Sequence, residues 1–252
     1  MKISVVIPNI NDKRIKRTLD SLYAQTYKNF EIIVIDGGST NSDLLDIYKN
    51  NIIDQLCIEK DEGIFDALNK GVAKANGDII YLIGSDDYLS DAYVFEHVIE
   101  KFKLKPSING VCIGCEFVNA SGKIIRSWKP KNITSSKIKF GIFPPHLSLF
   151  LKKDVYNKVG KFQYKEYNNV ACDIFWLLDM SILIPDIAIE VIGNHHLFME
   201  YGGASTGSYK AVIKQFKLVH KYSRLKSTYL PVWFLLSPIR TFSKITQFKL
   251  FS

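Results

Sequence analysis

Apolar runs alternate with helix-like segments over the first 90 residues, and this alternation restricts the chain to few folds. The runs cover residues 3–8, 30–36, 53–59 and 78–85, and each is short and rich in aliphatic side chains, as buried strands are. The stretches between them have helical length and periodicity. Because strand–helix–strand units build parallel sheets, the pattern predicts an α/β fold with a mostly parallel sheet flanked by helices.

The second half of the chain departs from this alternation. Two apolar runs within residues 110–128 flank Ser121 and Gly122, which predicts a β-hairpin in place of another helical crossover. The remaining expected elements are helices over residues 152–158 and 171–181 and strands over residues 187–192 and 195–201.

Length and composition allow one large folded domain. The 252 residues are 47% apolar, which is enough for a sizeable core. The sequence contains no internal repeat and no low-complexity linker. We therefore expect one domain over residues 1–207 and a C-terminal appendage over residues 208–252.

The basic excess of the chain lies in this appendage. Nine of the 33 Lys and Arg residues and none of the 25 acids follow Glu200, so residues 1–200 carry 24 basic side chains against 25 acidic ones. Between Lys210 and Arg224 the cations recur every three or four residues, which predicts an amphipathic basic helix. This helix either docks on the domain with its basic face in solvent or lies on an anionic membrane.

Residues 228–251 favour the membrane surface. They mix aromatic and aliphatic side chains with Lys and Arg, and their apolar part is shorter than the ~20 residues of a membrane span. Such a segment is typical of peripheral attachment to anionic lipid.

The N-terminus and the cysteines predict a cytoplasmic protein. The first apolar run is interrupted by Pro8 and is too brief for a signal peptide. Of the cysteines, only Cys112 and Cys115 are close in sequence, and one such pair is a weak zinc motif because structural zinc takes four ligands. We expect reduced, buried cysteines.

The placement of glycine excludes two common nucleotide-binding folds. A dinucleotide-binding fold needs glycines directly after its first strand, but the first glycine here is Gly37 and the first loop begins at Asn9. The sequence also lacks the GxxxxGK[ST] motif of a P-loop. Dehydrogenases and P-loop nucleotidases are therefore excluded.

Polar and acidic side chains instead follow each of the four predicted parallel strands. Each has an ordinary explanation as a turn or a helix cap, but the carboxyl ends of parallel strands meet at one rim, where open α/β sheets bind ligands. An aspartate there can hold a hard cation against a diphosphate. The side chains at the four strand ends are Asn9 and Asn11, Asp36, Asp61, and Ser85 with Asp86 and Asp87.

Three segments carry a resemblance to a known family. The segments VVIPNIN, YAQTYKNFEIIVIDGGSTNSD and EKDEGIFDALNKGVAKANGDIIYLIGSDD resemble the family 2 glycosyltransferases of the GT-A fold, in particular the branch that makes bacterial capsule, exopolysaccharide and O-antigen. The resemblance covers about residues 1–205 and is most specific in the first 90. It implies transfer of a sugar from a nucleotide-diphosphate sugar with inversion at the anomeric carbon.

The resemblance also implies residue roles. The last acid of the DxD-type motif, here Asp87, binds Mg²⁺ or Mn²⁺ that bridges the donor diphosphate, and Asp86 lies near the ribose or the sugar. The remaining implied donor-binding residues are Pro8, Asn9, Asn11, Asp36, Asp61 and Ser85.

Two departures concern the base of the donor. Many relatives have a Tyr that stacks on uracil where this chain has Ile10, and a second aspartate where it has Gly37. A UDP-sugar is the expected donor by resemblance, and dTDP and GDP sugars remain alternatives.

The resemblance places the catalytic base at the start of a late helix. Asp173 is the best match, although an acid in a first turn also stabilises the helix dipole. Asp179 is the alternative candidate for the catalytic base, but it lies within the predicted helix and not at its start. His146 lies where relatives often carry a histidine before a strand, which implies a place beside donor or acceptor, although a lone histidine is more often structural.

Two further segments are candidates for substrate contacts. Residues 201–206 resemble a family loop that closes over the donor, and as plain sequence they read as a turn. Of His195 and His196, at most one can face the site, because adjacent strand residues point to opposite sides.

The acceptor and the alternative functions follow from the same features. The resemblance implies a lipid-linked glycan acceptor at the inner face of the cell membrane. A nucleic-acid-binding protein would carry its basic residues along a face of the main domain, whereas residues 1–200 are nearly neutral, so no nucleic-acid partner is expected. An inactive GT-A-like scaffold is disfavoured because both acids needed for chemistry are present.

Overall fold

The computed structural model describes residues 1–119, 121–167 and 171–200. The predicted appendage, the boundary at residue 207 and the loop over residues 201–206 lie outside these residues. Strand and helix alternate through the first third of the chain, as predicted. Its elements are β1 Ile3–Asn9, α1 Ile15–Tyr23, β2 Phe30–Asp36, α2 Ser42–Lys49, β3 Gln55–Ile58, α3 Ile64–Lys74 and β4 Ile79–Leu82.

The rest of the described chain adds shorter strands and a second group of helices. Its elements are β5 Tyr88–Leu89, α4 Val94–Leu104, β6 Gly110–Val118, β7 Ile124–Trp128, β8 Ile133–Thr134, α5 Ser135–Lys139, the 3-10 turn η1 His146–Ser148, β9 Leu149–Lys152, α6 Lys153–Val159, α7 Tyr164–Tyr167, α8 Cys172–Leu183 and β10 Ala188–Glu200.

One mixed sheet joins the strands in the order β3-β2-β1-β4-β9-β6-β10-β5. The strands β3, β2, β1 and β4 are mutually parallel, whereas β9 runs antiparallel to both β4 and β6. From β1 the chain moves outward to β2 and β3 and then returns to β4 on the other side of β1. The gap between the carboxyl ends of β1 and β4 is therefore a topological switch point, where such sheets bind ligands.

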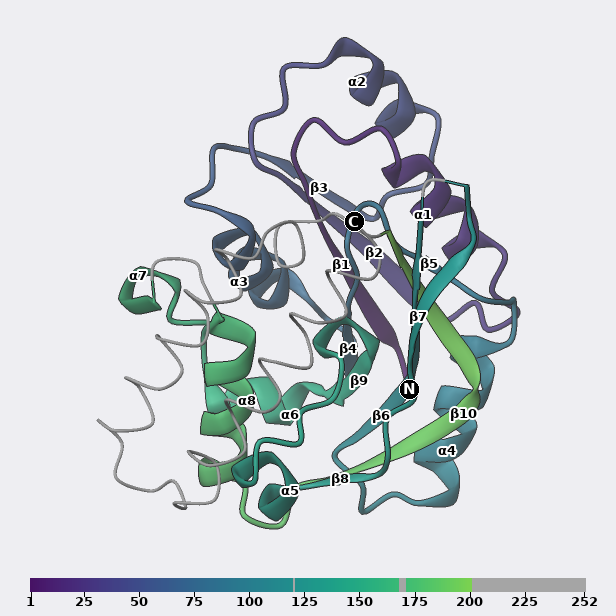
Figure 1. Ribbon diagram of the computed structural model, residues 1–252. Coiled ribbons are helices and arrows are strands. Elements are labelled where there is room, and N and C mark those ends of the chain that lie inside the picture. Colours follow the sequence, from purple (N-terminus) through teal and green to yellow (C-terminus); the bar gives the residue numbers. More distant parts are fainter. Residues whose placement is uncertain (120, 168–170, 201–252) are drawn as a thin grey trace.

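Helices cover both faces of this sheet (Figure 1). The helices α1, α2 and α4 pack on one face, where β1 contributes Ile3, Val5 and Ile7. On the other face Val6 packs against α3, and the same core continues through α6 and α8. All seven residues of β1 are buried, which explains why its sequence is apolar on both faces apart from Ser4 and Asn9. The predicted fold class is confirmed.

The predicted hairpin is also confirmed, since β6 and β7 pair antiparallel around Ser121 and Gly122. The expected helices over 152–158 and 171–181 correspond to α6 and α8. All four cysteines are free thiols, and three of them are buried.

The prediction of separate strands over 187–192 and 195–201 is wrong. One strand, β10, runs through both segments and pairs with β6, with a register shift between Ile192 and His196. Gly193 and Asn194 lie in that shift and are exposed. A β-bulge there accommodates residues that in sequence resemble a turn.

The close approach of α3 to β1 yields a prediction for stability. A Cβ atom on Gly71 would lie 2.2 Å from Cγ1 of the buried Val6. We expect Gly71→Ala to lower the free energy of unfolding by about 1–3 kcal/mol through overpacking, measured by urea unfolding. Gly193→Ala is the matched control because nothing lies within 4 Å of its added Cβ. Equal stability of the two variants would contradict the expectation.

No described helix is both long and apolar enough to cross a bilayer.

Candidate active site

The end of β1 and the end of β2 are joined by a buried hydrogen-bond network. The strand register pairs Asn9 with Asp36. The Asp36 side chain is fully buried, and its Oδ1 accepts from the backbone N–H groups of Gly38, at 3.0 Å, and Ser39, at 2.6 Å. The Tyr48 hydroxyl donates to Asp36 Oδ2 at 2.6 Å. Asp36 therefore shapes the loop after β2 and has little surface left for a ligand.

Asn9 differs from Asp36 because one of its polar atoms is unused. Its Nδ2 donates to the Tyr48 hydroxyl at 2.6 Å, and that hydroxyl has only one proton, which goes to Asp36. The network thereby fixes the orientation of the Asn9 amide. Its Oδ1 is buried and has no hydrogen-bond partner among the described residues, so Asn9 can accept a hydrogen bond from a ligand.

Asn11 ties the first loop to the second. Its backbone has a φ of 53°, a left-handed conformation that Asn tolerates better than most residues. Its Oδ1 accepts from the backbone N–H groups of Thr40, at 2.9 Å, and Asn41, at 3.2 Å. Pro8, which directly precedes Asn9, is buried within β1. The two asparagines therefore hold different parts of one rim.

Asp61 lies directly against Gly37. Its Oδ1 accepts from the backbone N–H of Gly63 at 2.9 Å, and its Oδ2 would lie 2.5 Å from a Cβ atom added to Gly37. No side chain fits at position 37 in this arrangement. The Asp61 carboxylate thus occupies the space that a side chain at position 37 would need, which explains the glycine there.

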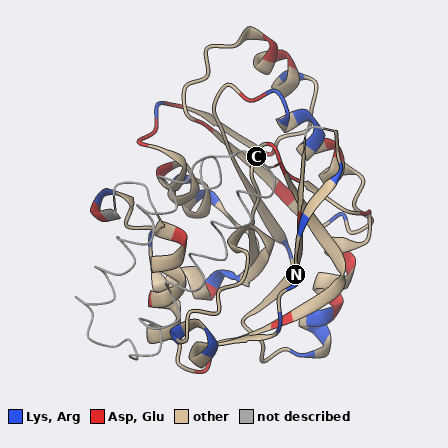
Figure 2. Ribbon diagram, in the orientation of Figure 1, with Lys and Arg blue, Asp and Glu red and all other residues tan. Residues whose placement is uncertain are grey.

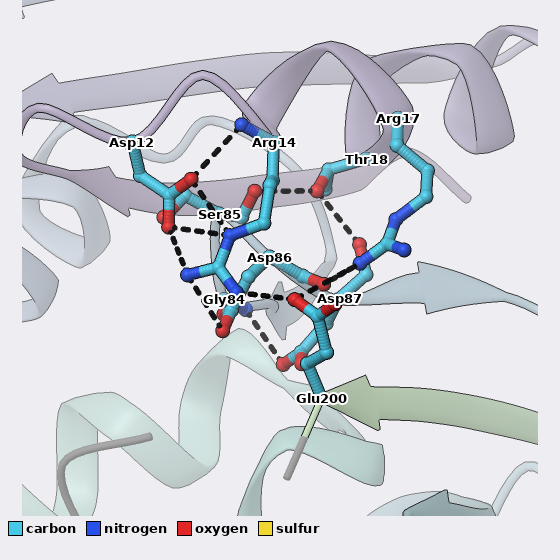
Figure 3. A network of polar contacts seen from close by, with 9 residues as sticks. All are labelled: Asp12, Arg14, Arg17, Thr18, Gly84, Ser85, Asp86, Asp87 and Glu200. Atoms are coloured by element: carbon cyan, nitrogen blue, oxygen red, sulfur yellow. Dashed lines mark hydrogen bonds and ion pairs between the residues drawn. The ribbon is translucent and has the colours of Figure 1, made fainter. Parts of the chain in front are cut away.

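The Asp86–Asp87 pair closes the rim after β4 and is clamped by α1 (Figure 3). The Thr18 hydroxyl lies 2.9 Å from the Ser85 carbonyl and 2.7 Å from the Asp87 carbonyl. Arg17 Nη2 donates to the Asp86 carbonyl at 2.7 Å. These contacts fix the backbone of the turn, so the two carboxylates are positioned by α1 as well as by β4.

Both carboxylates approach the backbone of Gly84. A Cβ atom there would lie 2.7 Å from Asp87 Oδ2 and 3.1 Å from Asp86 Oδ1. Asp87 Oδ2 accepts from the Gly84 backbone N–H at 3.2 Å. The absence of a side chain at Gly84 allows the two acids to converge.

Two arginines and two further acids surround the pair, and the sequence did not reveal them as site residues. Arg14 forms ion pairs with Asp12, at 2.6 Å, with Glu200, and with Asp86, at 3.5 Å (Figure 3). Arg17 lies 3.7 Å from Glu200. The spacing of Arg14 and Arg17 on one face of a helix start was the available signal, but Glu200 is brought in only by the fold.

The surroundings of Asp86 and Asp87 disfavour two free negative charges and favour a bound proton or cation. Burial, reinforced by the neighbouring charge of Asp86, raises the pKa of Asp87 to about 8, and only 2% of the residue is exposed. Burial also raises the pKa of Asp86, although Arg14 opposes this rise. Two adjacent carboxylates in a dehydrated turn favour either a proton or a cation.

These residues fit a divalent metal of the Mg²⁺ or Mn²⁺ type. The converging oxygens over Gly84 are the hard donors that such ions take, usually as one or two carboxylates completed by substrate phosphates and water. The described residues contain no group of three or more His, Cys, Asp and Glu side chains that could hold a metal alone. The set is therefore suited to a metal that arrives with a phosphorylated ligand.

His146 and Asp173 are brought together on the opposite face of the sheet from α1. His146 lies in η1, directly before β9, whose antiparallel pairing with β4 places η1 near the carboxyl end of β4. Its ring packs edge-on against Phe162 and Trp176. Asp173 lies in the first turn of α8.

The surroundings of His146 disfavour the charged form of its ring. Burial lowers the pKa of His146, and the charge of Asp173 opposes this shift. The Nε2 atom is buried without a hydrogen-bond partner among the described residues. An unpaired ring nitrogen next to a carboxylate is free to contact a ligand hydroxyl.

The other two candidate histidines, His195 and His196, lie outside this arrangement. His195 is buried and bonds Asp91 at 2.7 Å and His97 at 2.6 Å, whereas His196 faces Glu116 at 3.7 Å. They point to opposite sides of β10, as expected for adjacent strand residues. Asp179 lies within α8, about one and two-thirds turns after Asp173.

Comparison with curated proteins identifies relatives. A family model described as "Glycosyl transferase family 2" matches residues 4–183. The PGL/p-HBAD biosynthesis glycosyltransferase of Mycobacterium tuberculosis is 37% identical over 94 residues, which cover 35% of this chain and 37% of that protein. An uncharacterized glycosyltransferase of Nostoc sp. is 28% identical over 173 residues, covering 63% of this chain and 53% of that protein. The chain thus matches about half or less of the length of these relatives.

Solved structures share the fold. TarS of Staphylococcus aureus superposes with a TM-score of 0.62 at 18% identity, covering 88% of this chain and 40% of TarS. The mannosyltransferase PcManGT of Pyrobaculum calidifontis gives a TM-score of 0.62 at 19% identity, covering 94% of this chain and 67% of that protein. At these identities the likeness shows the GT-A fold alone. Together with the family model, which matches more than half of the chain, it shows that this chain belongs to glycosyl transferase family 2.

Proposed function

We propose that the protein is an inverting glycosyltransferase that moves a sugar from a UDP-sugar to a hydroxyl of a growing, lipid-linked bacterial surface glycan. The observation that carries the proposal is the converging pair of the half-buried Asp86 and the buried Asp87 at the switch point of the sheet. Similar structures support the donor class, since TarS 1-349 was solved with UDP-GlcNAc and PcManGT with GDP-Man and Mn²⁺.

The proposed donor site uses the rim between β1 and β4. Asp87 is the metal-binding residue, and its neighbour Asp86 contacts the ribose or the sugar. The bound metal supplies positive charge to the departing diphosphate. The free Oδ1 of Asn9 accepts a hydrogen bond from the nucleoside, while Asn11, Asp36 and Asp61 hold the loops that surround it.

Asp173 is the proposed base. Its carboxylate removes the proton of the acceptor hydroxyl as that oxygen attacks the anomeric carbon. The bond from the anomeric carbon to the diphosphate oxygen breaks, and the nucleoside diphosphate leaves with the bonding electrons. His146, whose Nε2 has no hydrogen-bond partner within the described ranges, accepts a hydrogen bond from a sugar hydroxyl and so orients it.

A donor panel tests this function. Purified protein is incubated with UDP, dTDP and GDP sugars and Mn²⁺, and release of free nucleotide is followed with and without a metal chelator. We expect metal-dependent release from one nucleotide class, with UDP-sugars preferred. Absence of both binding and release for every donor would refute the enzyme assignment.

The basic appendage is proposed to hold the protein on the inner face of the cell membrane. The described residues carry interspersed charges of both signs (Figure 2), whereas residues 208–252 contain nine Lys and Arg and no acid. Anionic lipid attracts such a segment. Lipid-linked acceptors would then be presented to the site from the same surface.

Liposome flotation tests this attachment. Replacing Lys214, Lys217, Lys221 and Arg224 together with Gln is expected to weaken binding to anionic vesicles by about 100-fold or more, at ~1 kcal/mol per cation. A protein ending at residue 207 should not float with these vesicles. Neutral vesicles serve as the lipid control. Equal flotation of all three proteins would contradict the proposal.

A further inference from the structure

Arg126 is held between two aromatic rings on the hairpin that follows β6. It lies on β7, directly opposite Phe117 of β6. Its Cζ atom is 5.2 Å from the centroid of the Phe117 ring and 5.5 Å from that of Trp128. Arg126 and Trp128 are both half-buried. Such packing fixes the position of a guanidinium without using its N–H groups.

No acid of the chain neutralises this guanidinium. Within residues 1–119, 121–167 and 171–200, no carboxylate lies within ion-pair distance of Arg126, and it has no hydrogen bond to these residues. The rest of the sequence contains no Asp or Glu. A half-buried charge without a partner is costly, and burial accordingly lowers the pKa of Arg126.

The other arginines of the described chain are paired. Arg14 binds three carboxylates, and Arg17 lies near Glu200 and bonds the Asp86 carbonyl. Arg126 therefore differs in having no partner for its five donors within the described part of the chain, and a planar guanidinium in this state matches a phosphate or carboxylate group.

Arg126 lies beyond the carboxyl end of β4, at the same end of the sheet as the Asp86–Asp87 turn. The register places Trp128 opposite Cys115, and β9 pairs antiparallel with both β6 and β4, so β6 and β4 run in the same direction. Burial raises the pKa of Cys115 to about 12, the charge of Asp87 adds to this rise, and Arg126 opposes it. The Cys115 thiol thus lies within the influence of both charges.

We propose that Arg126 binds an anionic group, a phosphate or a carboxylate, on the acceptor. In the proposed function the donor diphosphate binds at Asp87, between the ends of β1 and β4. The β6–β7 hairpin lies on the other side of β4 in the sheet, beyond β9. This assignment rests on the proposed glycosyltransferase function and specifies the acceptor class: a glycan that carries negative charge near the attacking hydroxyl.

The test uses methyl phosphate as the probe and the full chain labelled with 5-fluorotryptophan. The sequence has three Trp residues, and Trp128→Phe assigns the ¹⁹F resonance of Trp128. With UDP and Mn²⁺ saturating, methyl phosphate should shift that resonance. Arg126→Gln should weaken the binding by about tenfold or more, as expected for loss of a charge-assisted hydrogen bond, and Arg126→Lys should retain part of it.

Controls separate the proposal from its alternatives. Lys123→Gln removes an exposed cation of the same hairpin and should leave methyl phosphate binding unchanged. UDP affinity, measured by calorimetry with Mn²⁺, should be equal in wild type and Arg126→Gln. A parallel loss of UDP affinity would assign Arg126 to the donor diphosphate instead and overturn the acceptor assignment.

Two other results would also refute it: no shift of the Trp128 resonance with methyl phosphate in wild type, or undiminished binding in Arg126→Gln. Circular dichroism and the retained binding of Arg126→Lys exclude misfolding as the cause of a loss. Failure of the proposed function would appear separately, as absence of UDP-sugar binding and turnover in wild type.

Discussion

Replacing Asp87 with Asn is expected to abolish metal-dependent release of nucleotide and, at the same time, to stabilise the metal-free protein. Turnover should fall by about 10³-fold or more, because the metal that offsets charge on the leaving diphosphate loses its ligand. Stability should rise because Asn is neutral, whereas a buried Asp87 has to give up its proton near pH 8.

The sign follows from the two pKa values of Asp87. Burial raises the folded pKa to about 8, above an unfolded value of about 3.9. The stabilising effect of the bound proton is therefore complete below about pH 4 and is lost as the pH rises to about 8. At pH 8, Asp87→Asn should unfold at a free energy higher by on the order of 3 kcal/mol.

Urea unfolding in the presence of EDTA at several pH values checks this expectation. Asp46→Asn is the matched control, since Asp46 is an exposed acid on α2, and it should change neither turnover nor the pH dependence. Added Mn²⁺ with UDP should stabilise wild type and leave Asp87→Asn unaffected. A variant that keeps metal-dependent activity would remove Asp87 from the metal site.

Asp173→Asn is expected to lower kcat by about 10²- to 10⁴-fold, the usual contribution of a general base. The donor KM and the affinity for Mn²⁺ with UDP should stay within a factor of about two of wild type, because Asp173 lies in the first turn of α8 and is not a ligand of the proposed metal site. The loss measured with a transfer assay would therefore lie in the chemical step.

Asp179→Asn provides the comparison within the same helix. It removes an acid of the same size about one and two-thirds turns later, and we expect it to keep most of the activity. If Asp179→Asn were inactive and Asp173→Asn active, the base would be reassigned to Asp179. A pH profile of kcat that loses its acidic limb in Asp173→Asn would support the base role.

Strands and loops that depend on local pattern were predictable from sequence. The range of β2 coincides with the predicted 30–36, and the polar residues after β1 to β4 do lie at adjoining strand ends. Local signals suffice here because a buried parallel strand is a continuous apolar run. The prediction of two strands in place of β10 was wrong because the bulge at Gly193 is stabilised by pairing with β6. Strand pairing between distant segments cannot be seen in the sequence of β10 alone.

Contacts between distant segments explain the rest. Tyr48 reaches Asp36 from α2, and Glu200 reaches Arg14 from the end of β10, 186 positions away. Neither side chain belongs to a motif. Arg126 was missed because its distinguishing property is the lack of an acidic neighbour, which can be judged only when the packing is known.

The ion pairs of Glu200 also determine where the protein tolerates added sequence. Glu200 ends β10 and is bound to Arg14 beside the Asp86–Asp87 turn. Met1 is 39% exposed and lies at the other end of β1, roughly 20 Å from Asn9 for a strand of this length. An affinity tag at the N-terminus therefore leaves the donor rim unchanged. A linker inserted directly after Glu200 would instead disturb the ion pair with Arg14 beside the Asp86–Asp87 turn.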